Sequence, residues 1–135
     1  MEKRVYKAES DKLHDVLSFI ESKLEEKECN LKAQMMITVM VEEIFINIAS
    51  YAYPNSSGET TICLDFDDKD NVVITFVDNG IEFNPLEKED PDITLSAEER
   101  KIGGLGIYMV KKTMDDVIYE RKDGNNILTI KKGIH

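Results

Sequence analysis

The feature that most constrains the fold is one long helical pattern between residues 31 and 53. Its apolar positions recur four, three, four and three residues apart, which describes one face of an α-helix buried against another layer. Asn30 is suited to cap the start of this helix, and Pro54 to end it. A helix of this kind needs a second layer to cover its apolar stripe, which consists of Ile37, Val41, Ile44, Ile48 and Tyr51.

Alternating segments predict that this second layer is a sheet. A short first strand is expected around Val5 and Tyr6, followed by a helix for which Ser10 and Asp11 supply the N-cap. Two strands, near 62–66 and 72–77, flank a turn at 68–71. In the second of them, the even-numbered apolar residues face one side and the odd-numbered ones the other.

The remainder of the chain predicts a long loop, a third helix and a closing hairpin. Between Asn79 and Lys101 there is no sustained period, and the glycines at 103–106 then open a helix. Strands near 117–121 and 127–131 flank the turn 123–125. The order is therefore β-α-α-β-β-loop-α-β-β. This order predicts an α+β fold in one domain, residues 1–135, with helices on one face of a mixed, mainly antiparallel sheet.

Charge excludes several classes of partner. The net charge is -10, so direct binding to nucleic acid or to an anionic membrane is not expected. Any phosphate must be held locally by backbone N–H groups, a metal ion or a few cations. Cys29 and Cys63 lack metal-site spacing, and we expect free thiols rather than a zinc site. The N-terminus lacks a signal-peptide pattern, which favours a cytoplasmic protein.

Glu43 and Asn47 are the first candidates for chemistry. They lie four residues apart on the long helix, so their side chains share one face beside the apolar stripe. An Asn oxygen suits Mg²⁺, and a Glu can orient or deprotonate a nucleophile. Taken alone, the pair is more often an ordinary helix surface.

Asp78 and Gly80 end a strand, where a carboxylate can accept a hydrogen bond from an exocyclic amine and a glycine permits close approach of a planar base. The alternative is a simple tight turn. Gly103, Gly104, Leu105 and Gly106 precede a helix, whose first N–H groups form an anion site. Here the alternative is a flexible hinge, and neither a dinucleotide fingerprint nor a P-loop is present.

In this order, these pieces resemble the GHKL ATPase superfamily, which has the Bergerat fold, a two-layer α/β sandwich. Within it, the chain is most similar to bacterial anti-sigma-factor serine/threonine kinases. The likeness extends from the first strand to the last. It rests on the segments VEEIFINIA (41–49), VDNG (77–80) with FNP (83–85), GGLGIYMV (103–110), MDDV (114–117) and NILTI (126–130).

The resemblance implies a role for each candidate residue. Glu43 is the expected general base, and Asn47 is the expected ligand of the Mg²⁺ that bridges the phosphates of ATP. Asp78 is expected to bind the adenine amino group, with Thr129 nearby and Gly80 allowing close approach. Backbone N–H groups of Gly103, Gly104, Leu105 and Gly106 would face the phosphates. Residues 84–101 would form a lid over ATP.

The resemblance also implies partners. The substrate would be a serine or threonine of a STAS-type anti-anti-sigma protein, a sigma factor would be the second partner, and a homodimer is common. This chain departs from the family at Tyr51, where histidine is frequent, at Ile102, where some relatives have a basic residue, and at Glu82, where a glycine is frequent. In place of that basic residue, Arg100 or Lys101 would reach the γ-phosphate.

Two other functions compete with the kinase. One is a regulatory module that binds ATP and a signalling partner with little phosphoryl transfer. The other is a small α+β domain without a nucleotide. Loss of transfer on Glu43→Gln with ATP binding retained would favour the kinase, and absence of any response to Mg-ATP would favour the last.

Overall fold

The predicted strands form one five-stranded sheet in the order β1-β2-β3-β5-β4, and every neighbouring pair is antiparallel. The computed structural model describes residues 1–87 and 104–135 of the chain. Within these residues the sheet contains no parallel pair, so the antiparallel part of the prediction is confirmed. The strands are β1 (Glu2–Lys7), β2 (Glu59–Phe66), β3 (Asn71–Asp78), β4 (Asp116–Lys122) and β5 (Asn125–Gly133).

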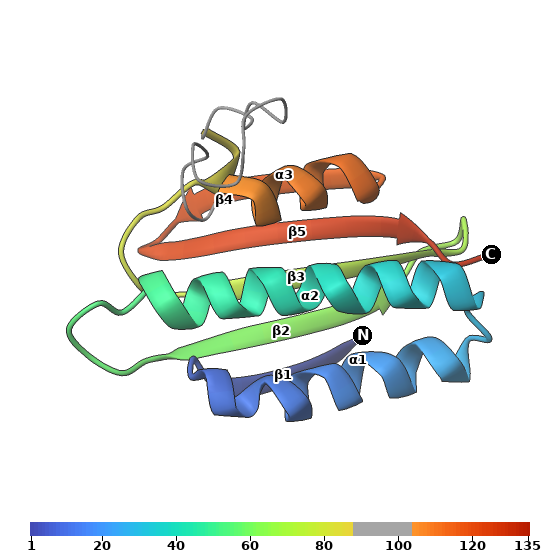
Figure 1. The fold of residues 1–135 in the computed structure, drawn as a ribbon, viewed down its shortest axis with the longest axis horizontal. Helices are drawn as coiled ribbons and strands as arrows, with labels where there is room; N and C mark the ends of the chain where they lie inside the picture. Colours follow the sequence, from blue (N-terminus) through green and yellow to red (C-terminus); the bar gives the residue numbers. More distant parts are fainter. Residues whose placement is uncertain (88–103) are drawn as a thin grey trace.

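Three α-helices lie together on one face of this sheet, which gives the expected two layers (Figure 1). The central helix, α2, contacts both of the others. Its N-cap is Asn30, whose Oδ1 accepts a hydrogen bond from the backbone N–H of Ala33 at 2.8 Å, as predicted. The helices are α1 (Leu13–Glu26), α2 (Leu31–Tyr51) and α3 (Gly104–Thr113), with short 3₁₀ turns η1 (Ser10–Lys12) and η2 (Pro85–Glu87).

The core lies between the helices and the sheet. The even-numbered residues of β3 are buried and the odd-numbered ones are half-buried, which confirms the predicted alternation. On α2, Ile37, Val41 and Ile44 are at most 1% exposed, whereas Tyr51 at the end of the stripe is 48% exposed. The stripe therefore leaves the core in its last turn.

Two predicted boundaries are wrong. Ser10 and Asp11 do not cap α1, because both lie in η1, and α1 begins at Leu13 without a side-chain cap. The long helix ends at Tyr51 rather than Tyr53, since Ala52 is its C-cap. Shifts of one or two residues are common at helix ends, where a 3₁₀ turn or a cap residue takes the place of regular α-helix.

The opposite face of the sheet carries no helix among the described residues. Its central positions hold mainly small and β-branched side chains, and Thr75 and Thr129 meet there through their hydroxyl groups at 3.2 Å. At its two edges, Val5 on β1 and Ile118 on β4 are 55% and 54% exposed. The centre of this face is thus uncharged, and charged side chains of both signs surround it, among them Lys3, Asp65, Glu120 and Lys131.

Of the described helices, α2 alone is long and apolar enough to cross a membrane by length and composition. The core helix of a soluble protein meets the same two conditions. Because α2 packs between α1 and α3 and buries its stripe against the sheet, packing accounts for its composition. Cys29 and Cys63 are free, as expected.

Candidate active site

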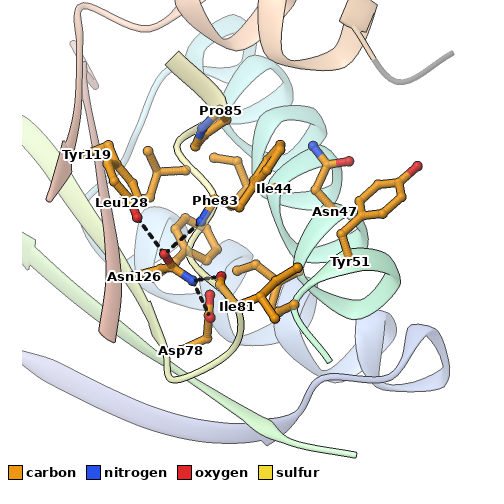
Figure 2. A pocket seen from close by; sticks show the side chains of 13 residues that line it. Ile44, Asn47, Tyr51, Asp78, Ile81, Phe83, Pro85, Tyr119, Asn126 and Leu128 are labelled. Atoms are coloured by element: carbon orange, nitrogen blue, oxygen red, sulfur yellow. Dashed lines mark hydrogen bonds between the residues drawn. The ribbon is translucent and has the colours of Figure 1, made fainter. Parts of the chain in front are cut away.

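A pocket opens at the end of the sheet where β3 and α2 both finish (Figure 2). Its empty space, including the part open to solvent, is about 500 Å³. One wall is the last two turns of α2, the other is the segment after β3, and β4 and β5 close the bottom. The lining residues are mainly apolar: Ile44, Asn47, Ile48, Tyr51, Ala52, Phe76, Asp78, Ile81, Phe83, Pro85, Tyr119, Asn126 and Leu128.

The buried polar side chains of the described residues lie in one row across the sheet beside this pocket. Thr60, Asp78 and Asn126 are 1%, 6% and 7% exposed, and they pair directly across β2, β3 and β5. Arg121 on β4 continues the row opposite Asn126. Burying polar groups costs free energy unless they are hydrogen-bonded, so a row of them at one edge of a core marks a constrained site.

Asp78 lines the pocket, as predicted from its place at the end of β3. Its Oδ1 accepts hydrogen bonds from the backbone N–H of Gly80 and from the side-chain amide of Asn126, both at 2.9 Å. Its Oδ2 has no partner among residues 1–87 and 104–135. A buried carboxylate with one free oxygen is equipped to accept a hydrogen bond from a ligand.

Asn126 is the site residue that the sequence analysis missed. Its amide nitrogen donates to Asp78 and, at 2.8 Å, to the carbonyl of Ile81. Its amide oxygen accepts from the backbone N–H of Phe83, from the hydroxyl of Tyr119 and from Arg121. A signal was available, because Asn126 occupies the same phase of its strand as the buried Leu128 and Ile130.

Gly80 permits a close approach, but the group that comes close is the end of α2 rather than a ligand. A Cβ atom at this position would clash with the backbone carbonyl of Ala52 at the end of α2. The next residue, Ile81, donates its N–H to that same carbonyl at 3.0 Å. The glycine therefore lets the pocket wall pack against the end of α2, and it does not line the pocket directly.

Glu43 and Asn47 lie one turn apart on α2, as predicted. Asn47 lines the pocket. Glu43 points its carboxylate at Gly106 in the first turn of α3, so closely that a Cβ atom at 106 would clash with Glu43 Oε2. The acid thus contacts the start of α3, and the amide one turn further along α2 lines the pocket.

The glycine-rich stretch is only partly described. Gly104 is the first residue of α3 and Gly106 lies in its first turn, together with Leu105. Gly103 lies outside the described residues, as do Arg100, Lys101, Ile102 and most of the expected lid at 84–101. The first N–H groups of α3 have no partner within the helix, and this end of the helix lies next to Glu43.

The structure does not bring Thr129 to the pocket. Thr129 faces the helix-free side of the sheet and meets Thr75 there, whereas Asp78 faces the helices. The two side chains are on opposite faces because successive residues of a strand alternate. Thr129 is therefore not among the residues that line the pocket, and Asn126 is the β5 residue that contacts Asp78.

The described residues fit a magnesium ion held mainly by its ligand. They contain no cluster of three or more acidic, histidine or cysteine side chains that could hold a metal ion on their own. Mg²⁺ that is bound with a nucleotide typically takes one or two protein oxygens, with phosphates and waters completing its shell. The amide oxygen of Asn47, which lines the pocket, is an oxygen of the type that such an ion takes.

The fold and this pocket define a class: two-layer α/β domains with a pocket between the end of a sheet, the end of a long helix and the segment that follows a central strand. The sequence profile of the histidine kinase-like ATPase domain matches residues 6–132. The chain therefore belongs to the histidine kinase-like ATPase domain family, and it has the fold that the GHKL resemblance implies.

Named relatives point in the same direction. The chain is 32% identical over 97 residues to the serine-protein kinase RsbW of Bacillus mycoides, a match that covers 69% of this chain and 60% of that protein. The serine/threonine-protein kinase BtrW of Bordetella bronchiseptica is 26% identical over 100 residues, with coverage of 73% and 70%. The match to the Bacillus relative leaves two fifths of that protein's length unaccounted for.

Solved structures agree on the fold. The RsbU and RsbW domains of a Mycobacterium tuberculosis protein superpose with a TM-score of 0.69 at 13% identity, covering 99% of this chain and 33% of that one. A blue-light activated histidine kinase of Erythrobacter litoralis gives 0.60 at 14% identity, with coverage of 90% and 42%. At such identities the likeness concerns the fold alone.

Proposed function

We propose that the chain is an ATP-dependent serine/threonine protein kinase that acts as an anti-sigma factor and phosphorylates a STAS-type anti-anti-sigma protein. The observation that carries this proposal is the convergence of Glu43 on Gly106 at the start of α3, beside a pocket that contains Asn47 and Asp78. The names of the relatives from Bacillus and Bordetella support the same activity.

In the proposed complex, the base would lie against Asp78 and the phosphates would lie at the start of α3. The free oxygen of Asp78 would accept a hydrogen bond from the adenine amino group, while the apolar walls would cover the faces of the base. The first N–H groups of α3, at Gly104, Leu105 and Gly106, would face the phosphates. Gly103 completes the proposed set from outside the described residues.

Phosphoryl transfer depends mainly on positioning and on the neutralisation of charge. Glu43 would accept the proton of the acceptor serine hydroxyl, and the adjacent turn of α3 would orient the phosphates next to it. Asn47 would ligate Mg²⁺, and Mg²⁺ when bound withdraws charge from the phosphate oxygens. These roles need a carboxylate and an amide one turn apart, which is how α2 presents them.

The test separates binding from transfer. We expect Glu43→Gln to bind Mg-ATP like the wild type in calorimetry, because glutamine keeps the size of the side chain. Transfer of labelled γ-phosphate to a purified STAS-domain protein should fall by roughly 10²–10⁴-fold, the usual contribution of a general base. Glu42→Gln is the matched control, since Glu42 is the neighbouring acid on the same helix.

The possible outcomes lead to different conclusions. Transfer at the wild-type rate by Glu43→Gln would show that Glu43 is not the base. Binding of Mg-ATP without transfer by the wild type itself would favour the regulatory ATP-binding module. Absence of Mg-ATP binding by the wild type would refute the proposal as a whole.

We also propose a homodimer and a cytoplasmic location, with a sigma factor as the second protein partner. The helix-free face of the sheet supports self-association, because its centre is uncharged and it exposes Val5 and Ile118 at its edges. Direct contact with nucleic acid or an anionic membrane is disfavoured by the net charge of -10. Sedimentation velocity on the purified chain measures whether it is a dimer.

A further inference from the structure

The donors and the acceptor of the Asn126 side chain are all used in hydrogen bonds within the protein, so this side chain cannot bind a ligand directly. Its two amide hydrogens go to Asp78 Oδ1 and to the carbonyl of Ile81. Its oxygen receives three donors, namely the N–H of Phe83, the hydroxyl of Tyr119 and the guanidinium of Arg121. A carboxamide has two donors and two lone pairs, so nothing is left over. Any effect of Asn126 on a ligand must act through the groups that it holds.

The first of these groups is the carboxylate of Asp78. Both of its internal hydrogen bonds fall on the same oxygen, Oδ1. A carboxylate that is held at one oxygen by donors from two directions cannot exchange its two oxygens by rotation without breaking both bonds. The orientation of Asp78, and so the position of Oδ2, is set by Asn126 together with the N–H of Gly80.

The second group is the pocket wall after β3. Asn126 binds this segment at Ile81 and at Phe83, two residues that line the pocket. Arg121 adds a bond from its Nη1 to the carbonyl of Gly80 at 3.0 Å. Figure 2 shows the carboxamide of Asn126 between Asp78 and this segment. One side chain thus fixes both the acceptor at the floor and the wall beside it.

The donors around Asn126 fix the orientation of its amide group. Burial raises the pKa of Tyr119, so its hydroxyl remains a donor to Asn126 at ordinary pH. Because Arg121 and Tyr119 both donate, the amide of Asn126 must present its oxygen to them and its nitrogen to Asp78. The hydrogen-bond pattern therefore leaves one orientation of the amide.

We propose that Asn126 is the positioning residue for base selectivity: it aims Asp78 Oδ2 into the pocket, so that the site prefers a purine bearing an exocyclic amino group. This inference rests on the proposed nucleotide-binding function and names how the same pocket selects its substrate. Asn126 does not touch the base. Its removal should weaken recognition of the amino group more than it weakens nucleotide binding in general.

The experiment compares two nucleotides on the full chain by calorimetry in the presence of Mg²⁺. One is ATP, and the other is purine riboside triphosphate, which lacks only the amino group. The wild type should prefer ATP on the order of tenfold, the value of one hydrogen bond to a charged group. In Asn126→Leu this ratio should fall to near one, while affinity for the purine nucleotide changes by less than about threefold.

Asn126→Asp provides a second variant that keeps the shape of the side chain. It retains the acceptor for Phe83, Tyr119 and Arg121 and loses both donors, so the ATP preference should again fall. Asn125→Asp is the matched control, because Asn125 is the adjacent residue at the start of β5 and has no bond to Asp78. Its ratio should equal that of the wild type. Thermal unfolding identifies which variants are folded.

Three results would overturn the inference. If both nucleotides lose affinity by the same factor in Asn126→Leu and Asn126→Asp, Asn126 has a general structural role only. If the wild type binds both nucleotides equally, Asp78 does not read the amino group, although nucleotide binding stands. If the wild type binds neither, the proposed function itself fails, and the inference fails with it.

Discussion

Two aspartates bracket β3, and they use their oxygens in different ways. Asp67, before the strand, accepts from the N–H of Lys69 and of Asn71 on Oδ1, and from the side chain of Asn71 on Oδ2, where Lys131 also pairs at 3.3 Å. Asp78, at the other end, receives its two donors on Oδ1 alone. Asp67 is partly exposed, whereas Asp78 is buried.

The difference distinguishes a carboxylate whose two oxygens are both used within the protein from one that keeps an oxygen without a partner among the described residues. Both oxygens of Asp67 accept hydrogen bonds that close the hairpin between β2 and β3, so neither oxygen is available to a ligand. Burial of Asp78 costs more free energy, because its carboxylate is buried and has fewer hydrogen bonds to offset the loss of water. Natural folds tolerate such a group when a ligand or a mechanism uses it. The residue type is the same, and burial and the distribution of donors distinguish the two.

The sharpest test of this comparison removes the negative charge at Asp78. In Asp78→Asn the new amide would place a donor opposite the amino group of the base, so we expect ATP affinity to fall by roughly 10–150-fold. The fold should persist, because asparagine can keep the Oδ1 acceptor for Gly80. Calorimetry measures the loss. Unchanged affinity would remove Asp78 from the proposed site.

The same substitution at Asp67 should lower stability and leave ATP affinity nearly unchanged. Asp67→Asn loses the pairing with Lys131 and the charge on its hydrogen bonds, and we expect the melting temperature to fall by a few degrees. ATP affinity should stay within about twofold of the wild type, because Asp67 lies at the far end of β3 from the pocket. A large loss of affinity here would contradict the division between the two ends.

The smallest expected effect is a dependence of stability on acid pH. Hydrogen bonds from Asn71 hold the pKa of the Asp67 carboxyl well below its usual range. The unfolded state therefore takes up a proton first, and the stability that Asp67 contributes is full above the unfolded pKa of about 4 and declines as pH falls below it.

Urea unfolding of the wild type and of Asp67→Asn at several pH values checks this sign. The gap between the two proteins should be constant from about pH 7 to pH 5 and should narrow between roughly pH 4 and pH 2. A gap that widens in acid would mean that the carboxyl is stabilised in its protonated form.

Much of the fold could be predicted from the sequence because it is encoded locally. The cap at Asn30, the stripe of α2 and the alternation of β3 depend on residues a few positions apart, and the structure confirms them. The start of α1 failed for a local reason as well. Ser and Asp are favourable both at a helix N-cap and in a preceding turn, and here they form η1.

The site was predictable only in part because its central contact is not local. Asp78 and Asn126 are 48 residues apart in sequence, and the β3–β5 register that pairs them cannot be deduced from either strand alone. The place of Thr129 shows a limit of the resemblance. Leu128 and Ile130 define the inward phase of β5, and Thr129 has the opposite phase. The resemblance implied a place near the base, whereas strand parity puts the side chain on the other face of the sheet.

The contact between Glu43 and Gly106 has an evolutionary consequence. A methyl group at position 106 would displace only the tip of a flexible acidic side chain, so the protein could fold and keep its base pocket while the carboxylate swings away. Under the proposed function, a single codon change from glycine to alanine would therefore remove phosphoryl transfer and leave nucleotide binding in place.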